Sequence, residues 1–504
     1  MTSLAILVMY GWAFVGVPSA FVVLPVRLAV FATMMAGWLF LPFGRVDVPG
    51  PLELDKFGAS VLPVLACIAV FDTNRLLRFR PALLDVPMLV WLTSPALSSL
   101  TNGLGVSDAI SESFQQLTRW GIPYLIGRLY ITDGTAIRQL ALVFFFGAVA
   151  YVPFVMWEMR MSPRLHADLY GFATYDHGGF TTRRLGGWRP VVFQQHGLML
   201  GLVMASAAFV GGWMWLTGAW RRFRFDMPFG AGSSHPRWRE WSGISRRTLG
   251  AEGSGPSFPA WPLVFGLIGI AVLCRALNAL VLVALVLGVL MLLRNRVWAT
   301  RLGLLALLAM PPMYFANRIS PDVVGMNLEA PIMELASRVD PERAVSLQVR
   351  FDNEYALSSH GMQRAAFGWG GWGRNRLHDE YGNDVTITDG YWIIVLTKHG
   401  LYGLLTWYTA LVLPVAMMVW RYSATTLASR EAAPALALAM VVMMFAVDCI
   451  PNAMLTTLHP MFVGGLAALM LAYGSPSRRR VSRGVQASAA TGPVGRPSGT
   501  AAGV

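Results

Sequence analysis

Residues 261–293 read WPLVFGLIGIAVLCRALNALVLVALVLGVLMLL, a long apolar run that points to the class of protein. It carries a single charge, Arg275, near its middle. About 20 apolar residues are enough for a helix to cross a bilayer, and an arginine deep in lipid is costly. The stretch therefore indicates membrane-spanning structure, and Arg275 must lie where its charge is tolerated.

The composition of the 504 residues supports a membrane protein. The chain is 55% hydrophobic and 13% charged, whereas soluble domains carry about 25% charged residues. We expect an all-α, polytopic integral membrane protein with about 12–13 transmembrane helices. The predicted spans lie near residues 4–24, 27–43, 57–72, 83–100, 113–131, 136–157, 191–217, 261–274, 276–293, 299–316, 390–420, 434–450 and 457–473.

The distribution of arginine predicts the topology. The formal net charge is +13, and basic residues concentrate in the segments 73–80, 221–247, 294–301, 421–430 and 475–483. Positive loops stay in the cytoplasm, so we interpret this charge as a topology signal and not as nucleic-acid binding. Because basic loops flank residues 261–293 on both sides, an even number of crossings must lie between them. The stretch is therefore predicted to form two short helices with Arg275 at their outer turn.

The same parity places segments 158–190 and 317–389 on the outer side. We divide the chain into N-terminal transmembrane helices (1–179), a membrane core that includes the outer loop 317–389 (180–473), and a disordered cytoplasmic tail (474–504). The tail is rich in Gly, Ala, Ser and Pro and has no periodicity, which is typical of disorder.

The outer loop 317–389 contains a predicted helix and a glycine-rich break. Residues 339–357 begin a helix with Asp340 as N-cap and Pro341 at the first helical position. Arg350 and Glu354 have the spacing of an ion pair on one helix face. The sequence FGWGGWGRNR (367–376) then ends the helix. Its glycines favour a structural turn, and its tryptophans, Trp369 among them, also suit a sugar-stacking surface.

Arginines gather on the predicted outer side. They are Arg183, Arg184 and Arg189 before the span at 191–217, Arg275 at the short-helix turn, and Arg350 in the outer loop. Arginine presents a fixed fork of donors that matches phosphate oxygens, so the set predicts a bound phosphate or pyrophosphate. Each arginine also has a simpler explanation, as a membrane-surface anchor or as an ion-pair partner. The histidines show no ligand spacing, so no metal site is predicted.

Four segments, taken in order, resemble the superfamily of O-antigen ligases and O-antigen (Wzy-type) or exopolysaccharide polymerases. They are RRLGGWRPVVFQQHGLMLGL, CRALNALVLV, VRFDNEYALSSHGMQRAAFGWGGWG and DGYWIIVLTKHGLYGLL, within residues 180–420. Arg184, Arg275 and Arg350 fall on the family's arginine positions, and Gly368, Trp369 and Gly370 fall on its glycine-tryptophan motif. Gly400 and Gly403 match the late helix.

The resemblance implies a large, GT-C-like membrane glycosyltransferase in the bacterial inner membrane, with its active site facing the periplasm. The donor would be a glycan on undecaprenyl pyrophosphate, held by Arg184, Arg275 and Arg350, with Arg183, Arg189, Lys398 and Trp369 as further candidates. The reaction would invert the anomeric centre with neither metal nor cofactor. Further partners would be the glycan acceptor, a chain-length regulator and a flippase.

The helix after the outer loop departs from the ligase pattern. Ligases commonly open this helix with a histidine, whereas this chain has Asp389. This aspartate would serve either as a general base or as a helix cap. The difference favours a polymerase that joins lipid-linked repeat units. The alternatives are a ligase that transfers the glycan to lipid A–core, a transporter or flippase of lipid-linked glycan, and a structural partner in polysaccharide export.

Overall fold

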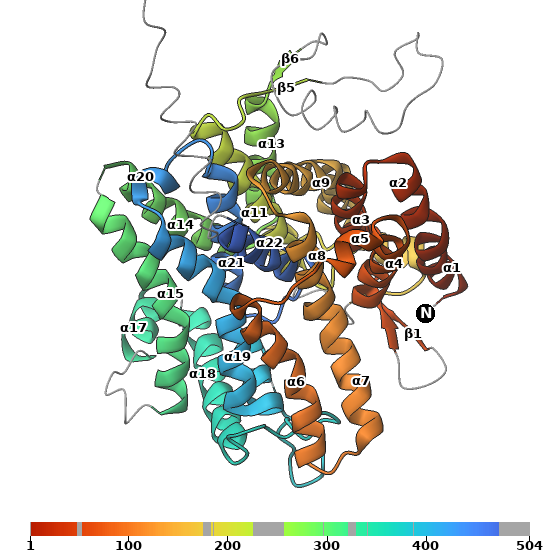
Figure 1. The fold of residues 1–504 in the computed structure, drawn as a ribbon. Helices are drawn as coiled ribbons and strands as arrows, with labels where there is room; N and C mark the ends of the chain where they lie inside the picture. Colours follow the sequence, from red (N-terminus) through yellow and green to blue (C-terminus); the bar gives the residue numbers. More distant parts are fainter. Residues whose placement is uncertain are drawn as a thin grey trace, which may run out of the picture.

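A computed structural model describes residues 2–47, 53–174, 183–184, 186–224, 257–295, 297–320, 329–339, 341–386 and 388–472. This part of the chain is mostly helical (Figure 1). Six of its helices are long and apolar enough to cross a membrane, and several shorter apolar helices accompany them. These features support membrane integration. The predicted tail 474–504 and residues 225–247 of the largest basic loop lie outside the described residues.

The N-terminal helices are α1 (Ser3–Gly11), the π-helical η1 (Trp12–Gly16), α2 (Val17–Val23), α3 (Val26–Phe40), α4 (Lys56–Phe71), α5 (Thr73–Leu77), the 3₁₀ turn η2 (Leu83–Asp85), α6 (Val86–Thr101), α7 (Val106–Gln116), the π-helical η3 (Leu117–Gly121), α8 (Ile122–Tyr130), α9 (Gly134–Met161) and α10 (Leu165–Tyr170).

The later helices are α11 (Gly197–Leu216), α13 (Trp261–Leu273), α14 (Leu277–Asn295), α15 (Val297–Ile319), α17 (Glu329–Val339), α18 (Pro341–Met362), α19 (Tyr391–Arg421), α20 (Ala424–Leu427), α21 (Ala433–Asp448) and α22 (Leu458–Ala472). Short strands pair in an antiparallel manner, β1 (Arg45–Asp47) with β2 (Glu53–Asp55), β3 (Arg183–Arg184) with β4 (Gly187–Trp188), and β5 (Arg222–Arg224) with β6 (Ser257–Pro259).

Each apolar segment predicted from the sequence coincides with a helix, with two shifts in boundary. The segment 113–131 is the second half of a longer helix, because α7, η3 and α8 follow one another without a break from Val106 to Tyr130. The segment 191–217 becomes helical only at Gly197. Its first residues form a turn instead, because the Glu158 carboxylate accepts hydrogen bonds from the backbone N–H groups of Val191 and Val192, both at 2.7 Å.

The predicted break at Arg275 is confirmed. α13 ends at Leu273 and α14 begins at Leu277. Arg275 adopts a φ of 56°, a left-handed conformation that is uncommon for a residue with a side chain. The break leaves the charged residue in the connection between the two apolar helices.

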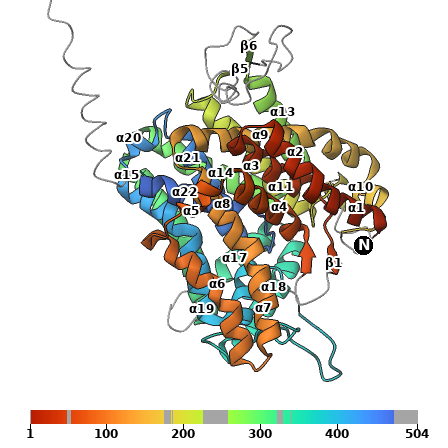
Figure 2. The same cartoon turned by 45° about the vertical axis from the view of Figure 1, so that its right-hand side comes forward.

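Three helices form the centre of the structure. Nearly every residue of α11, α21 and α22 is buried, and Figures 1 and 2 show these helices enclosed by the others. α22 packs closely on α8 where Gly464 faces the backbone of Tyr124 and Gly127 faces that of Met461. Small residues permit such close approach between apolar helices, and this packing is typical inside a membrane.

The predicted break after the outer-loop helix is also confirmed, and the structure gives it a function in the fold. α18 ends at Met362, and the glycine-rich segment crosses α19 where that helix is interrupted at Gly400 (φ 65°, ψ −165°). Leu401 N–H donates to the Ala365 carbonyl at 2.7 Å, and Trp369 N–H donates to the Thr397 carbonyl at 2.9 Å. The segment thus satisfies backbone groups that the interrupted helix leaves unpaired.

Candidate functional site

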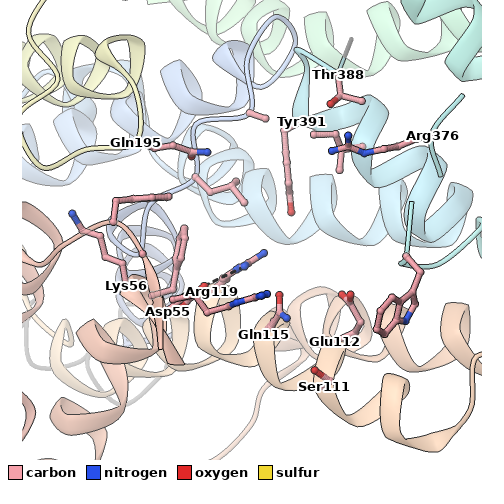
Figure 3. A pocket seen from close by; sticks show the side chains of 18 of the residues that line it. Asp55, Lys56, Ser111, Glu112, Gln115, Arg119, Gln195, Arg376, Thr388 and Tyr391 are labelled. Atoms are coloured by element: carbon pink, nitrogen blue, oxygen red, sulfur yellow. Dashed lines mark hydrogen bonds and ion pairs between the residues drawn. The ribbon is translucent and has the colours of Figure 1, made fainter. Parts of the chain in front are cut away.

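A polar cavity of about 990 Å³ lies between distant parts of the chain. Helix α7 and η3 form one wall, the β1–β2 hairpin and the start of α4 form a second, and the outer loop and the start of α19 form a third (Figure 3). Its charged lining residues are Arg45, Asp55, Lys56, Asp108, Glu112, Arg119 and Arg376. A cavity of this size accommodates a drug-sized or oligosaccharide-sized ligand.

Ion pairs hold several of these charges in place. Asp55 caps α4 by accepting from Gly58 N–H, and its other oxygen lies 3.1 Å from the Arg119 guanidinium. Arg376 pairs with Asp384 outside the cavity, and this interaction lowers the pKa of Asp384 to about 2. The cavity therefore presents charges that are fixed before a ligand arrives, as preorganised recognition requires.

Two aromatic residues of the cavity differ in their exposure. Tyr391 lines the wall opposite Arg119 (Figure 3), but it is buried and its ring stacks on Trp120 at 6.1 Å between centroids. The Trp372 indole is exposed, and its N–H donates to Asp108 at 2.7 Å. Aromatic faces beside hydrogen-bonding groups provide both an apolar contact and a polar edge.

Arg184, Arg189 and Arg275 form a cluster around the β3–β4 hairpin, which we call the hairpin cluster. The Arg275 guanidinium donates to the Trp188 carbonyl at 3.1 Å and lies directly against Gly187, the register partner of Arg184. Arg189 is buried and donates to the Arg275 carbonyl at 3.3 Å. Burial, together with the charge of Arg184, lowers the pKa of Arg189 to about 10. The neighbouring Arg183 is exposed, with its guanidinium 5.2 Å from the Trp188 ring.

Arg350 belongs to a second group. Its Nε lies 2.9 Å from an Asp389 carboxylate oxygen, and the two side chains are 47% and 39% exposed. The expected Arg350–Glu354 pair is wrong, because Glu354 lies 3.3 Å from Arg318 and accepts from the Tyr314 hydroxyl at 2.6 Å. The alternative of Asp389 as a helix cap is also wrong.

The start of α19 is capped by backbone groups instead. Gly390 is its N-cap and contributes no side-chain bond, and Tyr391 N–H donates to the carbonyls of Cys449 and Asn452, both at 3.0 Å. The Asp389 carboxylate is thus engaged with Arg350 and not with the helix that follows it.

The three predicted pyrophosphate ligands therefore divide between two groups, and none of the three lines the polar cavity. Asn278, three residues after Arg275, donates to Asp448 at 2.7 Å, and the next residue, Cys449, accepts from Tyr391 N–H. Gln195, close in sequence to Arg189, and Thr388, next to Asp389, both line the cavity. The segments that carry the two groups thus both continue into the cavity wall.

Lys398 and Trp369 have structural partners. Lys398 Nζ lies 2.7 Å from Glu112. The Trp369 ring stacks on His360 at 4.6 Å between centroids, and its N–H donates to the His360 carbonyl at 2.8 Å. The Arg364 guanidinium also lies 5.0 Å from that ring. These contacts support the structural interpretation of Trp369 over a sugar-stacking one.

The cavity residues of α7 and η3 were not among the residues expected at the site from the sequence. Asp108, Ser111, Glu112, Gln115 and Arg119 recur at the spacing of one helix face. Moreover, Arg119 falls inside the segment predicted as a span, and an ionisable residue there indicates function. Polar residues at the spacing of one helix face, followed by an arginine inside an apolar segment, were therefore the sequence pattern that could have predicted this cavity wall.

Within the described part of the chain, no three His, Cys, Asp or Glu side chains are grouped to hold a metal ion. No protein-family model matches the sequence, and no curated protein matches it either.

Proposed function

We propose that this protein is a membrane glycosyltransferase that polymerises oligosaccharide repeat units linked to undecaprenyl pyrophosphate. It would span a bacterial inner membrane about 12–13 times, with a GT-C-like fold, and act at the periplasmic face in O-antigen or exopolysaccharide synthesis. Transfer of the glycan to lipid A–core is the alternative within the same family, and the aspartate at position 389 favours the polymerase.

One observation carries this proposal. The hairpin cluster adjoins exposed apolar side chains, and the chain that follows it leads to the polar cavity. Leu273 and Leu277, which flank the Arg275 turn, are each 51% exposed, and such apolar side chains would contact acyl or prenyl chains in a membrane. Gln195, six residues after Arg189, lines the polar cavity. A donor with a prenyl tail, a pyrophosphate and a glycan would need these three kinds of surface, namely apolar side chains, guanidinium groups and a polar cavity.

The chemistry follows from this arrangement. An acceptor hydroxyl oxygen attacks the anomeric carbon of the donor, and the bond from that carbon to the pyrophosphate oxygen breaks. The electron pair leaves with the prenyl pyrophosphate, and its developing charge is stabilised by fixed guanidinium groups. The hydroxyl proton passes to a carboxylate within hydrogen-bond reach.

Asp389 and Glu112 are the candidate carboxylates. Each is held by one cation, Asp389 by Arg350 and Glu112 by Lys398. Glu112 lines the cavity directly, and Asp389 follows the lining residue Thr388. We assign Asp389 as the base and Arg350 as the group that positions it, because the pair is open enough for a hydroxyl to approach.

The test uses the full-length protein in proteoliposomes supplied with undecaprenyl-pyrophosphate-linked oligosaccharide. We expect Arg184→Ala, Arg275→Ala and Arg350→Ala each to lower polymer formation by about 100-fold or more, and Asp389→Asn to do the same. Arg160→Ala is the matched control, because Arg160 is an exposed arginine at the end of α9. Glu112→Gln tests the rival base.

Four results would contradict the proposal or part of it. If Arg184→Ala and Arg275→Ala both made polymer at the wild-type rate, the donor site would be wrong. A wild-type rate in Arg350→Ala would contradict its role as the group that positions Asp389. Loss of product in Glu112→Gln, with normal product in Asp389→Asn, would transfer the role of base to Glu112. Movement of donor between leaflets without growth of the glycan would identify a transporter.

A further inference from the structure

A second pocket, of about 400 Å³, lies far from the polar cavity. Four arginines line it, namely Arg75, Arg78, Arg80 and Arg128, together with Asn74 and Thr132. The two pockets occupy opposite ends of α4, since Lys56 at its start lines the cavity and Asp72 just after its end lines the second pocket. A helix of 16 residues separates these ends by about 24 Å.

Two of the four arginines are held rigidly. Arg128 donates to both oxygens of the buried Asp85 carboxylate, at 2.6 and 3.0 Å. Arg75 donates to Asp72 at 2.9 Å and to the Leu129 carbonyl at 3.0 Å. These guanidinium groups give the pocket a fixed positive wall before any ligand binds.

The other two arginines have unused donors. Arg78 and Arg80 are exposed, and neither forms an ion pair with any residue that the structure describes. The lining contains one carboxylate, Asp72, against four guanidinium groups. An anionic ligand with several acceptor oxygens would complete this charge balance, and phosphate matches the guanidinium fork.

We propose that this pocket binds a phosphate group, presented by an anionic phospholipid headgroup or by a soluble phosphate compound. The surroundings favour the lipid. Leu77 and Leu83, on either side of the arginine-rich segment, are 77% and 89% exposed, so an acyl chain has apolar side chains to contact beside the pocket. Basic pockets between membrane helices on the cytoplasmic side commonly accept anionic lipid headgroups.

This inference does not depend on the proposed glycosyltransferase activity. The test uses the full-length protein in detergent and measures bound lipid by native mass spectrometry, with dioleoylphosphatidylglycerol and dioleoylphosphatidylcholine as probes. A second arm measures binding of inorganic phosphate by thermal shift. The test variant is Arg78→Gln with Arg80→Gln, and the control is Arg160→Gln with Arg430→Gln, which removes the same charge from exposed positions outside the pocket.

We expect the wild type and the control to prefer phosphatidylglycerol, and the test variant to bind it about tenfold more weakly. Preference for phosphatidylglycerol without binding of inorganic phosphate would identify the lipid as the source. Binding of inorganic phosphate that the test variant loses, without a lipid preference, would identify a soluble source. Equal binding by the wild type and the test variant in both arms would overturn the proposal.

Discussion

Replacing Gly187 by alanine should move Arg275 without altering any charge. A Cβ at position 187 would come within 3.0 Å of three guanidinium atoms of Arg275. These atoms are the far end of a flexible side chain, so they can shift while the backbone stays in place. Restoring ordinary van der Waals separation requires a displacement of about 1 Å or more.

The displacement should cost activity far more than stability. It disturbs the hydrogen bond from Arg275 to the Trp188 carbonyl, a loss of about 1 kcal/mol. A misplacement of about 1 Å in a group that contacts the reacting atoms can lower a rate by about 100-fold. We therefore expect Gly187→Ala to lower polymer formation by about 10- to 100-fold while changing the Tm by only a few degrees.

The assay is polymer formation in proteoliposomes, with Tm measured on the same preparations. Gly269→Ala in α13 is the control, because a Cβ there would meet nothing within 4 Å. The double variant with Arg275→Ala is decisive. If Gly187 acts through Arg275, the double variant loses no more activity than Arg275→Ala alone, whereas additive losses would refute the reasoning.

Three further predictions concern the frame of the site. Gly400→Ala should destabilise the protein by about 3 kcal/mol, because the backbone conformation at this position is nearly exclusive to glycine and a Cβ would lie 2.6 Å from the Ala366 carbonyl carbon. The control is Gly212→Ala, which should leave the Tm unchanged because a Cβ there would meet open space. Burial lowers the pKa of His166 from its ordinary 6.5 to about 4. The stability contributed by the neutral ring is therefore complete above pH 6.5 and is lost as pH falls toward 4, by up to about 1.4 kcal/mol per pH unit. Over this range the Tm of His166→Gln should fall less than that of the wild type. Trp372→Ala should lower polymer formation about tenfold with an unchanged Tm. Trp369→Phe should lower the Tm slightly with normal activity, because the Trp369 indole N–H donates a hydrogen bond within the fold. The opposite pattern would mean that Trp369 contacts the sugar.

The helix break at Arg275 illustrates what could be predicted from the residues alone. Two basic loops on the same side required a break within the apolar run between them, and one helix does end at Leu273 and the next begin at Leu277. The glycine-rich break after α18 was predictable for a similar local reason. Its docking onto the interruption at Gly400 was not, because the two segments meet only when the outer loop folds back on α19.

The partners of the charged residues show where the pattern misled. Sequence spacing suggested Glu354 as the partner of Arg350, yet Asp389 holds that position. Glu112 and Lys398, 286 residues apart, form a pair that no local rule indicates. Arg119 was absorbed into a predicted span, although it lines the cavity.

The positions of the helices could be predicted from the residues, because apolar composition and periodicity are local and a membrane-spanning segment must satisfy its own backbone hydrogen bonds. Which arginines meet, which carboxylates are engaged and where the cavity opens became visible only in the folded chain. Those outcomes depend on how helices pack against one another, and packing is set by side-chain shapes from distant segments, such as the glycines that bring α8 against α22.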